Sequence, residues 1–386
     1  MIVPLIMPTC HICATGDVRE LPAYASLTRV TSDCKPWPAG GRLGVCAHCG
    51  SVQKFADEQW KSEIASIYAD YTIYFQAGGA EQALFLGDAA EPVTRSEWLV
   101  QQVIAHTALP ATGRLLDIGC GNGALLRAFS RAIPGWTLAG TEQSGATREM
   151  VERIPRVEAL YTGPLQETPG QFDMISLVHV LEHISHPLEL LAGVAGKLKP
   201  GGILFVEVPN VEENPFDLLI ADHVSHFTPA TVTALLEAAG YCVGESSQSW
   251  MVKEFGALAT FVGRRAEHVV RSSRGATAGL DWLLSVRAAA RRARADADGR
   301  PFGLFGSSIA ATWLAQQVDC AMDFFVDEDP NRQGQIFMGK RVLSPRQAPA
   351  GSAVFVGIGG DVAGIVARRL SLDRASVAWI PAPPLG

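Results

Sequence analysis

A glycine-rich turn between an apolar strand and a helix restricts this chain to a small set of folds. The stretch "RLLDIGCGNGALLRAF" at 114–129 has the apolar run of a buried strand, then a turn with three glycines, then the apolar spacing of a helix. Three further strands are predicted in "WTLAGTEQS", "FDMISLVHV" and "GGILFVEVPN", with helical stretches between them. Strands that alternate with helices form a parallel sheet with helices on both faces, so we predict an α/β fold. A ligand of such a sheet binds at the carboxyl ends of the strands.

The residues of this turn suit a nucleotide-like ligand. Gly119 and Gly121 let the backbone approach a ligand closely, and Asp117 stands just before them. Glu142 ends the next predicted strand, where a carboxylate can bind ribose hydroxyl groups. "GCGNGA" also satisfies the G-x-G-x-x-G/A pattern of dinucleotide-binding proteins, so the turn alone leaves NAD open.

The wider pattern over 95–263 resembles class I S-adenosylmethionine (SAM)-dependent methyltransferases. "LLDIGCGNG" is similar to their first motif, "GPLQE" to the loop beside the adenine, "LVHVLEHISHP" to the motif after the fourth strand, and "LKPGG" to the motif before the fifth. The resemblance implies a Rossmann-like methyltransferase sheet closed by an antiparallel pair, with SAM as cofactor. The residues that it implies around SAM are Tyr74, Asp117, Gly119, Gly121, Glu142, Gln143, Leu165, Gln166 and His179.

The N-terminal cysteines predict a metal site. Five of the eight cysteines lie within the first 49 residues, and four of these form "CHIC" and "CAHC", two C-x2-C pairs separated by 32 residues. Two such pairs make a closed tetrahedral thiolate site, which suits structural zinc, so we predict zinc ligands at Cys10, Cys13, Cys46 and Cys49. Cys34, His11 and His48 are spare candidates, and the alternatives are unrelated reduced thiols or a redox pair.

The order of parts resembles bacterial C-methyltransferases that act on nucleotide-linked deoxysugars. That order is a zinc-binding module at 1–60, a tyrosine-containing connecting segment at 61–94, a methyltransferase core at 95–263, a helical linker at 264–299, and a C-terminal Rossmann-like α/β domain at 300–386. In the family, a tyrosine-rich segment packs over SAM, which implies this role for Tyr68, Tyr71 and Tyr74. An aromatic stripe that covers a core is the alternative.

The stretch "IADHVSHF" at 220–227 holds the candidate catalytic residues. The resemblance places Asp222 and His223 on the family's Glu-His pair and His226 on a later tyrosine, so we expect His223 to act as general base, oriented by Asp222. Ile220 stands where the family has a tyrosine. The expected reaction is therefore C-methylation of a sugar-like, nucleotide-linked or free small molecule. O- or N-methylation of another metabolite, or a catalytically silent zinc-containing binding protein, remains open.

A metal ion among the central histidines is not what the sequence favours. His179, His183 and His186 have a spacing that can bring two rings onto one helical face as metal ligands. The turn sequence "SHP" instead favours a helix cap with surface histidines, and the 220–227 cluster lacks the spacing of a cysteine-type site.

The C-terminal part contains a second strand, turn and helix in "RPFGLFGSSIAATWLAQQ", followed by Asp327. The resemblance implies that this domain helps to bind the sugar nucleotide, with Gly306, Ser307 and Ser308 as candidate substrate contacts, because helix N-termini of this kind bind phosphate. A helix cap in a scaffold domain and a separate NAD site are the alternatives.

Composition limits the partners. With 32 basic and 39 acidic side chains and a net charge of −7, the chain offers no basic surface for nucleic acid or anionic lipid. No apolar run approaches the ~20 residues of a membrane span, and the N-terminus lacks the basic region of a signal peptide. We therefore expect a soluble cytoplasmic protein with a small-molecule substrate, and its oligomeric state stays open.

Overall fold

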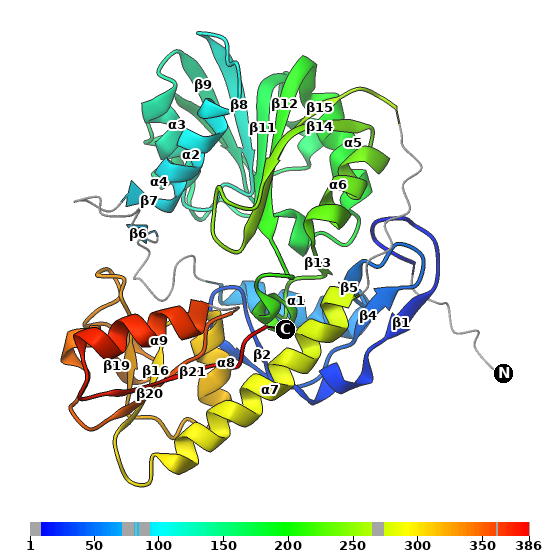
Figure 1. Ribbon diagram of the computed structural model, residues 1–386. Helices are drawn as coiled ribbons and strands as arrows, with labels where there is room; N and C mark the ends of the chain where they lie inside the picture. The colour runs from blue at the N-terminus through cyan, green and yellow to red at the C-terminus, as the bar shows by residue number, and fades with distance from the viewer. Residues whose placement is uncertain are drawn as a thin grey trace, which may run out of the picture.

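The large sheet predicted in the middle of the chain is present in the computed structural model, which describes residues 9–71, 81, 83–84, 93–264, 274–359 and 362–385. Its seven strands lie in the order β10-β9-β8-β11-β12-β15-β14 (Figure 1). The first five are parallel, whereas β15 and β14 are antiparallel to their neighbours, as the resemblance implied. The bounds are β8 Gly113–Ile118, β9 Trp136–Thr141, β10 Val157–Tyr161, β11 Phe172–Val178, β12 Leu198–Pro209, β14 Tyr241–Ser247 and β15 Glu254–Phe261.

Helices cover both faces of this sheet because successive strand residues point to opposite sides. Leu115 of β8 is buried with the helices α2, α3 and α4, whereas the next residue, Leu116, is buried in a second cluster with α5 and α6. The helix bounds are α2 Arg95–Ala105, α3 Ala124–Ala132, α4 Arg148–Glu152, α5 Pro187–Lys197 and α6 Pro229–Ala238. The carboxyl ends of the parallel strands are thereby left as the edge at which a ligand can bind.

The N-terminal region forms a small antiparallel sheet in which one strand comes from the middle of the chain. Its order is β1-β4-β5-β13, in which β13 (Ser225–His226) begins two residues after the predicted catalytic residue His223. The other elements of this region are β1 Val18–Glu20, η1 Pro22–Ser26, β2 Arg29–Val30, β3 Pro36–Trp37, β4 Leu43–Cys46, β5 Val52–Lys54 and α1 Glu58–Ala69. A short pair, β6 Ala83–Leu84 and β7 Val93–Thr94, leads into α2.

The C-terminal region is a second α/β unit, as expected. Its six strands lie in the order β18-β19-β17-β16-β20-β21, and all neighbours are parallel except β18 and β19. The long helix α7 (Arg274–Asp296) leads into it. The remaining bounds are β16 Phe302–Phe305, α8 Ile309–Gln317, β17 Phe324–Val326, β18 Ile336–Phe337, β19 Lys340–Leu343, η6 Pro345–Gln347, β20 Ala353–Val356, α9 Val362–Asp373 and β21 Ala378–Pro381.

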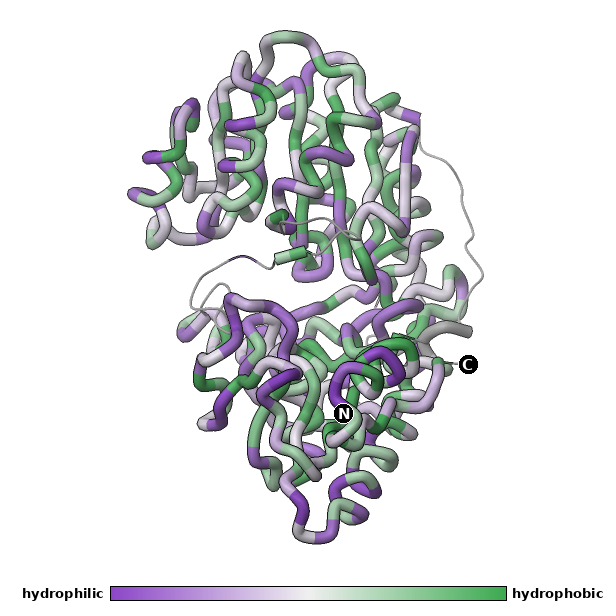
Figure 2. The backbone as a smooth tube through the Cα atoms, turned by 60° about the vertical axis from the view of Figure 1, so that its left-hand side comes forward, coloured by the Kyte–Doolittle hydropathy of each residue, from purple (hydrophilic) through white to green (hydrophobic). Residues whose placement is uncertain are grey.

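The two ends of the chain share one hydrophobic core. Tyr24 of the N-terminal region and Trp313 of α8 belong to the same cluster of buried side chains, which also contains η5 (Pro215–Leu219). Phe216 of η5 contacts Trp282 and Trp313, with ring centroids 5.2 and 5.9 Å apart. Both terminal regions therefore lie together below the large sheet, in the views of Figure 1 and Figure 2 alike. Among the described residues, no helix combines the length and apolarity that a bilayer crossing requires.

Candidate active site

The glycine-rich turn has the backbone conformation that its sequence predicted. Gly119, Gly121 and Gly123 have φ angles of +70°, +57° and +79°, in the left-handed region where a side chain is strained. A Cβ on Gly119 would also lie 2.8 Å from Cγ2 of Val180. The turn therefore packs directly against the segment that follows β11, and glycine is needed at this position for both reasons.

Glu142 lies beside this turn at the end of β9. One carboxylate oxygen accepts a hydrogen bond of 2.7 Å from the amide of Gly121, and the other accepts one of 3.0 Å from the amide of Gln143. The Glu142 side chain is only partly buried, and Gln143 is exposed. A partly exposed carboxylate at a strand end fits the ribose-binding position expected for SAM.

Asp117 lies underneath the turn. It is 3 % exposed, and its carboxylate accepts a hydrogen bond of 2.7 Å from Ser176 of β11. Burial raises the pKa of Asp117 to about 7. Asp117 therefore joins β8 to β11 below the turn through this hydrogen bond. Direct contact between Asp117 and SAM stays a prediction.

The residues expected beside the adenine are on a short 3-10 helix, η3 (Leu165–Glu167), which follows β10. Leu165 is half-buried against the core, whereas Gln166 is exposed and its carbonyl accepts a hydrogen bond from Lys197. Tyr74, the last residue of the SAM set, lies outside the described residues.

His179 follows β11 directly, in a left-handed conformation with φ +54°. Its Nδ1 lies 2.9 Å from Oε1 of Glu182, which is buried. Burial disfavours the charged ring, but Glu254 and Glu182 outweigh this effect and raise the pKa of His179 to about 9. Glu254 on β15 and Glu207 on β12 bring two more carboxyl groups to this edge of the sheet, and the guanidinium of Arg95 on α2 pairs with Glu207 and lies 2.7 Å from Nε2 of His179.

His223 is oriented by Asp217, and not by Asp222 as the sequence predicted. Nδ1 of His223 lies 2.7 Å from Oδ1 of Asp217, and Nδ1 of His226 lies 2.6 Å from Oδ2 of the same carboxylate. All three side chains are buried. Burial disfavours ionisation of Asp217, but the two imidazoles outweigh it and hold the pKa of this carboxyl below its usual range. Asp217 belongs to η5, and the only sequence signal for it was a single acidic residue inside the apolar run "NPFDLLIA".

Asp222 instead connects to the N-terminal region. Its two carboxylate oxygens accept hydrogen bonds from the amide and the hydroxyl group of Ser32, at 2.8 and 2.5 Å. One of these oxygens also lies 3.5 Å from Nδ1 of His183. The sequence expectation fails here because Ser32 and Asp222 are brought together only by the tertiary fold.

His183 is part of the site rather than a surface histidine. It lies on η4 (Leu181–His183), and its ring centroid is 4.6 Å from that of His223 in an edge-on arrangement. The phenol oxygen of Tyr68, at the end of α1, lies 3.1 Å from Nδ1 of His183. Tyr71 packs edge-on against Tyr68, with centroids 5.8 Å apart. Two of the three expected tyrosines therefore lie beside the catalytic candidates, whereas His186 is exposed.

The N-terminal sheet supports the segment that carries these residues. Strand β5 pairs with β13, so that Val52 lies opposite His226. The buried ammonium of Lys54 on β5 donates to the carbonyls of Ile220 and His223, the latter at 2.8 Å. Burial lowers the pKa of Lys54 to about 7. The backbone around His223 is therefore built jointly by two distant parts of the chain.

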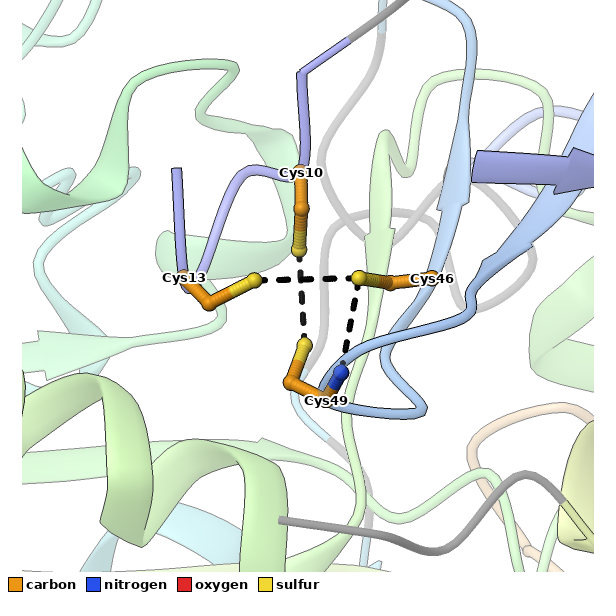
Figure 3. A group of neighbouring side chains, drawn as sticks. All are labelled: Cys10, Cys13, Cys46 and Cys49. Carbon is orange, nitrogen blue, oxygen red and sulfur yellow. Dashed lines mark hydrogen bonds between the residues drawn. The ribbon is translucent and has the colours of Figure 1, made fainter. Parts of the chain in front are cut away.

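The four predicted zinc ligands converge in the N-terminal region (Figure 3). The sulfurs of Cys10, Cys13, Cys46 and Cys49 all lie within 4.8 Å of one another, with Cys10 and Cys49 3.5 Å apart and Cys13 and Cys46 3.7 Å apart. Zn–S bonds of about 2.3 Å in a tetrahedron place sulfurs about 3.8 Å apart, so the four thiols fit zinc. The sulfurs are too far apart for disulfides. Hydrogen bonding with the Cys49 thiol lowers the pKa of Cys10 to about 4, whereas burial raises the pKa of Cys46 and the hydrogen bond with Cys10 raises the pKa of Cys49.

The candidate substrate contacts of the C-terminal region have different environments. Gly306 has a φ of +88° and precedes α8, and Ser308 is partly buried at the N-terminus of that helix. Ser307 is fully buried and donates to Oδ2 of Asp327 at 2.7 Å. The Ser307 hydroxyl therefore stabilises the turn against β17, which corrects the prediction that it faces a substrate.

Comparison with known proteins places this site in a methyltransferase domain. Residues 97–245 match the model of a family described as "Methyltransferase domain". A ubiquinone biosynthesis O-methyltransferase of Xanthomonas campestris is 33 % identical over 139 residues, which is 33 % of this chain and 56 % of that protein. One from Aeromonas salmonicida is 28 % identical over 155 residues, 35 % of this chain and 65 % of its own. The chain thus spans between about half and two thirds of the length of the curated relatives that it matches.

Solved methyltransferase structures also align with the chain. The mitomycin 7-O-methyltransferase aligns with a TM-score of 0.37 and 24 % identity, over 45 % of this chain and 54 % of its own. A putative methyltransferase in a Haloferax volcanii complex aligns with a TM-score of 0.38 and 15 % identity, over 43 % of this chain and 90 % of its own. From the family model and the strand order, the central segment is a class I SAM-dependent methyltransferase domain.

Proposed function

We propose that this chain transfers a methyl group from SAM to a small molecule, at the carboxyl edge of the large sheet. The observation that carries the proposal is the close packing of the glycine-rich turn against the segment that holds His183. A Cβ on Gly119 would clash with Val180, which precedes Leu181–His183 of η4. The donor pocket and the side chains that can activate an acceptor are therefore adjacent. In-line transfer depends mostly on such alignment, which can contribute about 7–11 kcal/mol in the best intramolecular cases.

SAM supplies an activated methyl group on a sulfonium, and the protein residues act on the acceptor. In this proposal, Glu142 binds the ribose hydroxyl groups and the amides of the 119–123 turn face the cofactor. His223, held by Asp217 through Nδ1, presents Nε2 as the atom that activates the acceptor. It can do so by accepting a proton or by holding a metal ion that makes the acceptor more acidic.

Two classes of acceptor are compatible with this site. The resemblance in module order supports a carbon next to a carbonyl in a sugar-like molecule, nucleotide-linked or free. The names of the curated relatives support a hydroxyl group instead. Both need removal of a proton from the acceptor, and both place an acceptor oxygen close to His223. Ile220, where the C-methyltransferases have a tyrosine, favours neither class of acceptor by itself.

The four cysteines complete the proposal as a structural zinc site. Their sulfurs have the number and spacing of a closed tetrahedral set, which leaves no position for a substrate. Its part would be to stabilise the N-terminal sheet on which β13 depends.

Calorimetric titration with SAM tests the proposal most directly. We expect one SAM to bind per chain, and we expect weaker SAM binding to Glu142→Gln. The control is Asp281→Asn, a change of an exposed aspartate on α7, which should leave SAM binding unchanged. A folded chain that does not bind SAM would overturn the proposal in favour of a silent binding protein. Exchange of solvent deuterium into a candidate carbonyl substrate without SAM would support a carbon acceptor, and methyl transfer without such exchange would support an oxygen acceptor.

A further inference from the structure

Three side chains next to the proposed SAM pocket form a group that none of the functions above requires as a unit. Glu182, His183 and His223 each bring one ligand atom within 4.8 Å of the others. Glu182 and His183 come from η4 and His223 comes from the segment after η5, so the group forms only in the folded chain. Glu182 is 1 % exposed and His223 4 %, and His183 is partly buried.

One polar atom of each of the three residues contacts a neighbouring group. Nδ1 of His223 lies 2.7 Å from Asp217, and Nδ1 of His183 lies 3.5 Å from the carboxylate of Asp222 and 3.1 Å from its carbonyl. Oε1 of Glu182 lies 2.9 Å from Nδ1 of His179. Carboxylates that hold the second nitrogen of an imidazole in this way are typical of metal-binding histidines, because they fix the ring and make the free nitrogen a better ligand.

The third observation is an unsatisfied atom. Oε2 of Glu182 is buried and has no hydrogen-bond partner among the described residues. A buried carboxylate oxygen without a partner destabilises the fold, so a group that satisfies it is expected. A cation between Glu182 and the two Nε2 atoms would provide that interaction.

A second group of close ligand atoms, Asp217, His223 and His226, shares one of these properties, because Nε2 of the buried His226 also has no hydrogen-bond partner among the described residues. Its close atoms are the carboxylate oxygens and the two Nδ1 atoms that already share protons at 2.7 and 2.6 Å. Hydrogen bonds account for the closeness of these atoms, whereas no hydrogen bond joins Glu182 to His183 or His223 among the described residues, so the inference concerns the first group.

We infer that Glu182, His183 and His223 bind a divalent cation beside the methyl donor. This inference rests on the proposed function and names how the acceptor would be activated. Two imidazoles and one carboxylate leave coordination positions open for an acceptor oxygen. Imidazole ligands suit Zn²⁺ or Fe²⁺, and the carboxylate together with the open oxygen positions suits Mn²⁺, so a divalent first-row metal ion fits this mixed set. This inference differs from the sequence expectation, which favoured no metal ion at these histidines.

For a hydroxyl acceptor the step balances without any further reactant. The acceptor oxygen binds the cation and loses its proton to water, because the bound metal lowers the pKa of a coordinated O–H group. The oxygen then forms a bond to the methyl carbon while the carbon–sulfur bond of SAM breaks. The electron pair of that bond remains on sulfur, so the products are the methyl ether, neutral S-adenosylhomocysteine and one proton. For a carbon acceptor, the cation would bind the carbonyl oxygen and stabilise the enolate.

Titration of the full chain with Mn²⁺, followed by the electron paramagnetic resonance signal of the free ion, tests the inference. The four cysteines do not compete for this probe, since thiolates favour zinc over manganese. We expect about one Mn²⁺ per chain, and at least about tenfold weaker binding in Glu182→Gln and in His223→Gln. His186→Gln is the matched control, because His186 belongs to the same segment but is exposed, and it should bind Mn²⁺ like the unmodified chain.

SAM titration of the same samples separates this inference from the proposed function. Variants that bind SAM normally but lose Mn²⁺ support the cation site and show that the fold is intact. A chain that binds SAM and no Mn²⁺ overturns the cation site but not the proposed function. Mn²⁺ binding that is equal in the unmodified chain, Glu182→Gln and His223→Gln also overturns it. If the chain binds Mn²⁺ through these residues but does not bind SAM, the cation site is supported and the proposed function is overturned.

Discussion

At the scale of single residues, the site consists of groups that the sequence could identify and groups that it could not. Gly119, Gly121 and Glu142 were predicted because a glycine turn and a strand-end carboxylate have a fixed place in a nucleotide-binding sheet. Asp217 was missed because residues six positions apart, as Asp217 and His223 are, do not contact each other within a helix or a strand, and His183 was missed because it meets His223 only in the tertiary fold. Local pattern predicts which backbone turns are possible, but not which buried partner an imidazole will find.

Replacement of Asp217 by asparagine should reduce turnover by about 10- to 100-fold, the usual effect of losing a group that orients a functional histidine. The neutral amide cannot hold both Nδ1–H groups as the carboxylate does. SAM affinity, measured by calorimetry, should change little, because Asp217 belongs to η5 and not to the turn. Asp281→Asn, an exposed aspartate on α7, is the control. Equal turnover in the two variants would contradict the assigned role of Asp217.

Gly119→Ala should weaken SAM binding by about tenfold, because the left-handed conformation costs a side chain about 1–2 kcal/mol. The added Cβ would also lie 2.8 Å from Val180. Gly196→Ala is the matched control, since a Cβ on this residue of α5 meets no atom within 4 Å in the described structure. A SAM dissociation constant for Gly119→Ala within twofold of that for Gly196→Ala would be inconsistent with a tight turn under the cofactor.

Asp117 should make stability depend on pH. Because its folded pKa is raised to about 7, above its unfolded value, the protonated form is the one that folding favours. Its contribution is fully present below about pH 4 and is lost as pH rises through 7. The free energy of unfolding of Asp117→Asn, measured in urea at a series of pH values, should therefore improve relative to the unmodified chain between pH 4 and 7. If the free energies of unfolding of Asp117→Asn and of the unmodified chain change in the same way with pH, the raised pKa of Asp117 is contradicted.

At the scale of elements, the large sheet was predictable and the small one was not. The strands "RLLDI" and "ILFVEV" are apolar runs bounded by turn residues, so they were found from pattern alone. Strand β13 has only two residues, Ser225 and His226, and it exists because β5 lies beside it. Two residues have no periodicity, and their partner strand lies far away in the sequence. The sequence placed His223 near the ligand edge but could not show what supports it.

Lys54→Met should lower the free energy of unfolding by about 1–3 kcal/mol, since it leaves the carbonyls of Ile220 and His223 without their buried donor. Turnover should fall as well, because these carbonyls belong to the backbone that positions His223. Lys61→Met on α1 is the control, because Lys61 is exposed. Denaturant unfolding with a SAM titration of each variant distinguishes a local change from general loss of the fold. An unfolding free energy like that of Lys61→Met would exclude a supporting role.

At the scale of the whole molecule, the order of parts could be predicted, but the way they join could not. A cysteine module, a methyltransferase sheet and a second α/β unit follow one another in the sequence as separate patterns. In the structure, the N-terminal region and the second α/β unit share a single hydrophobic core with η5, so they are not independent domains. Sequence patterns report which faces are apolar, but they do not report which apolar faces meet.

Loss of the proposed zinc site should therefore affect more than the N-terminal region. In Cys46→Ser, metal analysis should show zinc falling from about one ion per chain, and turnover should fall because β5 no longer holds β13 in register. SAM binding should be less affected, since the glycine turn lies in the large sheet. Cys242→Ser, an exposed cysteine on β14, is the control. Full turnover in a Cys46→Ser sample free of zinc would contradict this coupling.

The core shared by both ends of the chain also has a consequence for synthesis on the ribosome. Tyr24 is made early, but Trp313, which belongs to the same core, is made roughly 290 residues later. At a synthesis rate of about 5–20 residues per second, about 15–60 s pass between the synthesis of Tyr24 and that of Trp313. During that interval the methyltransferase sheet can fold first, and the N-terminal residues remain open to chaperones. The part of the chain that emerges first is thus among the last to be completed.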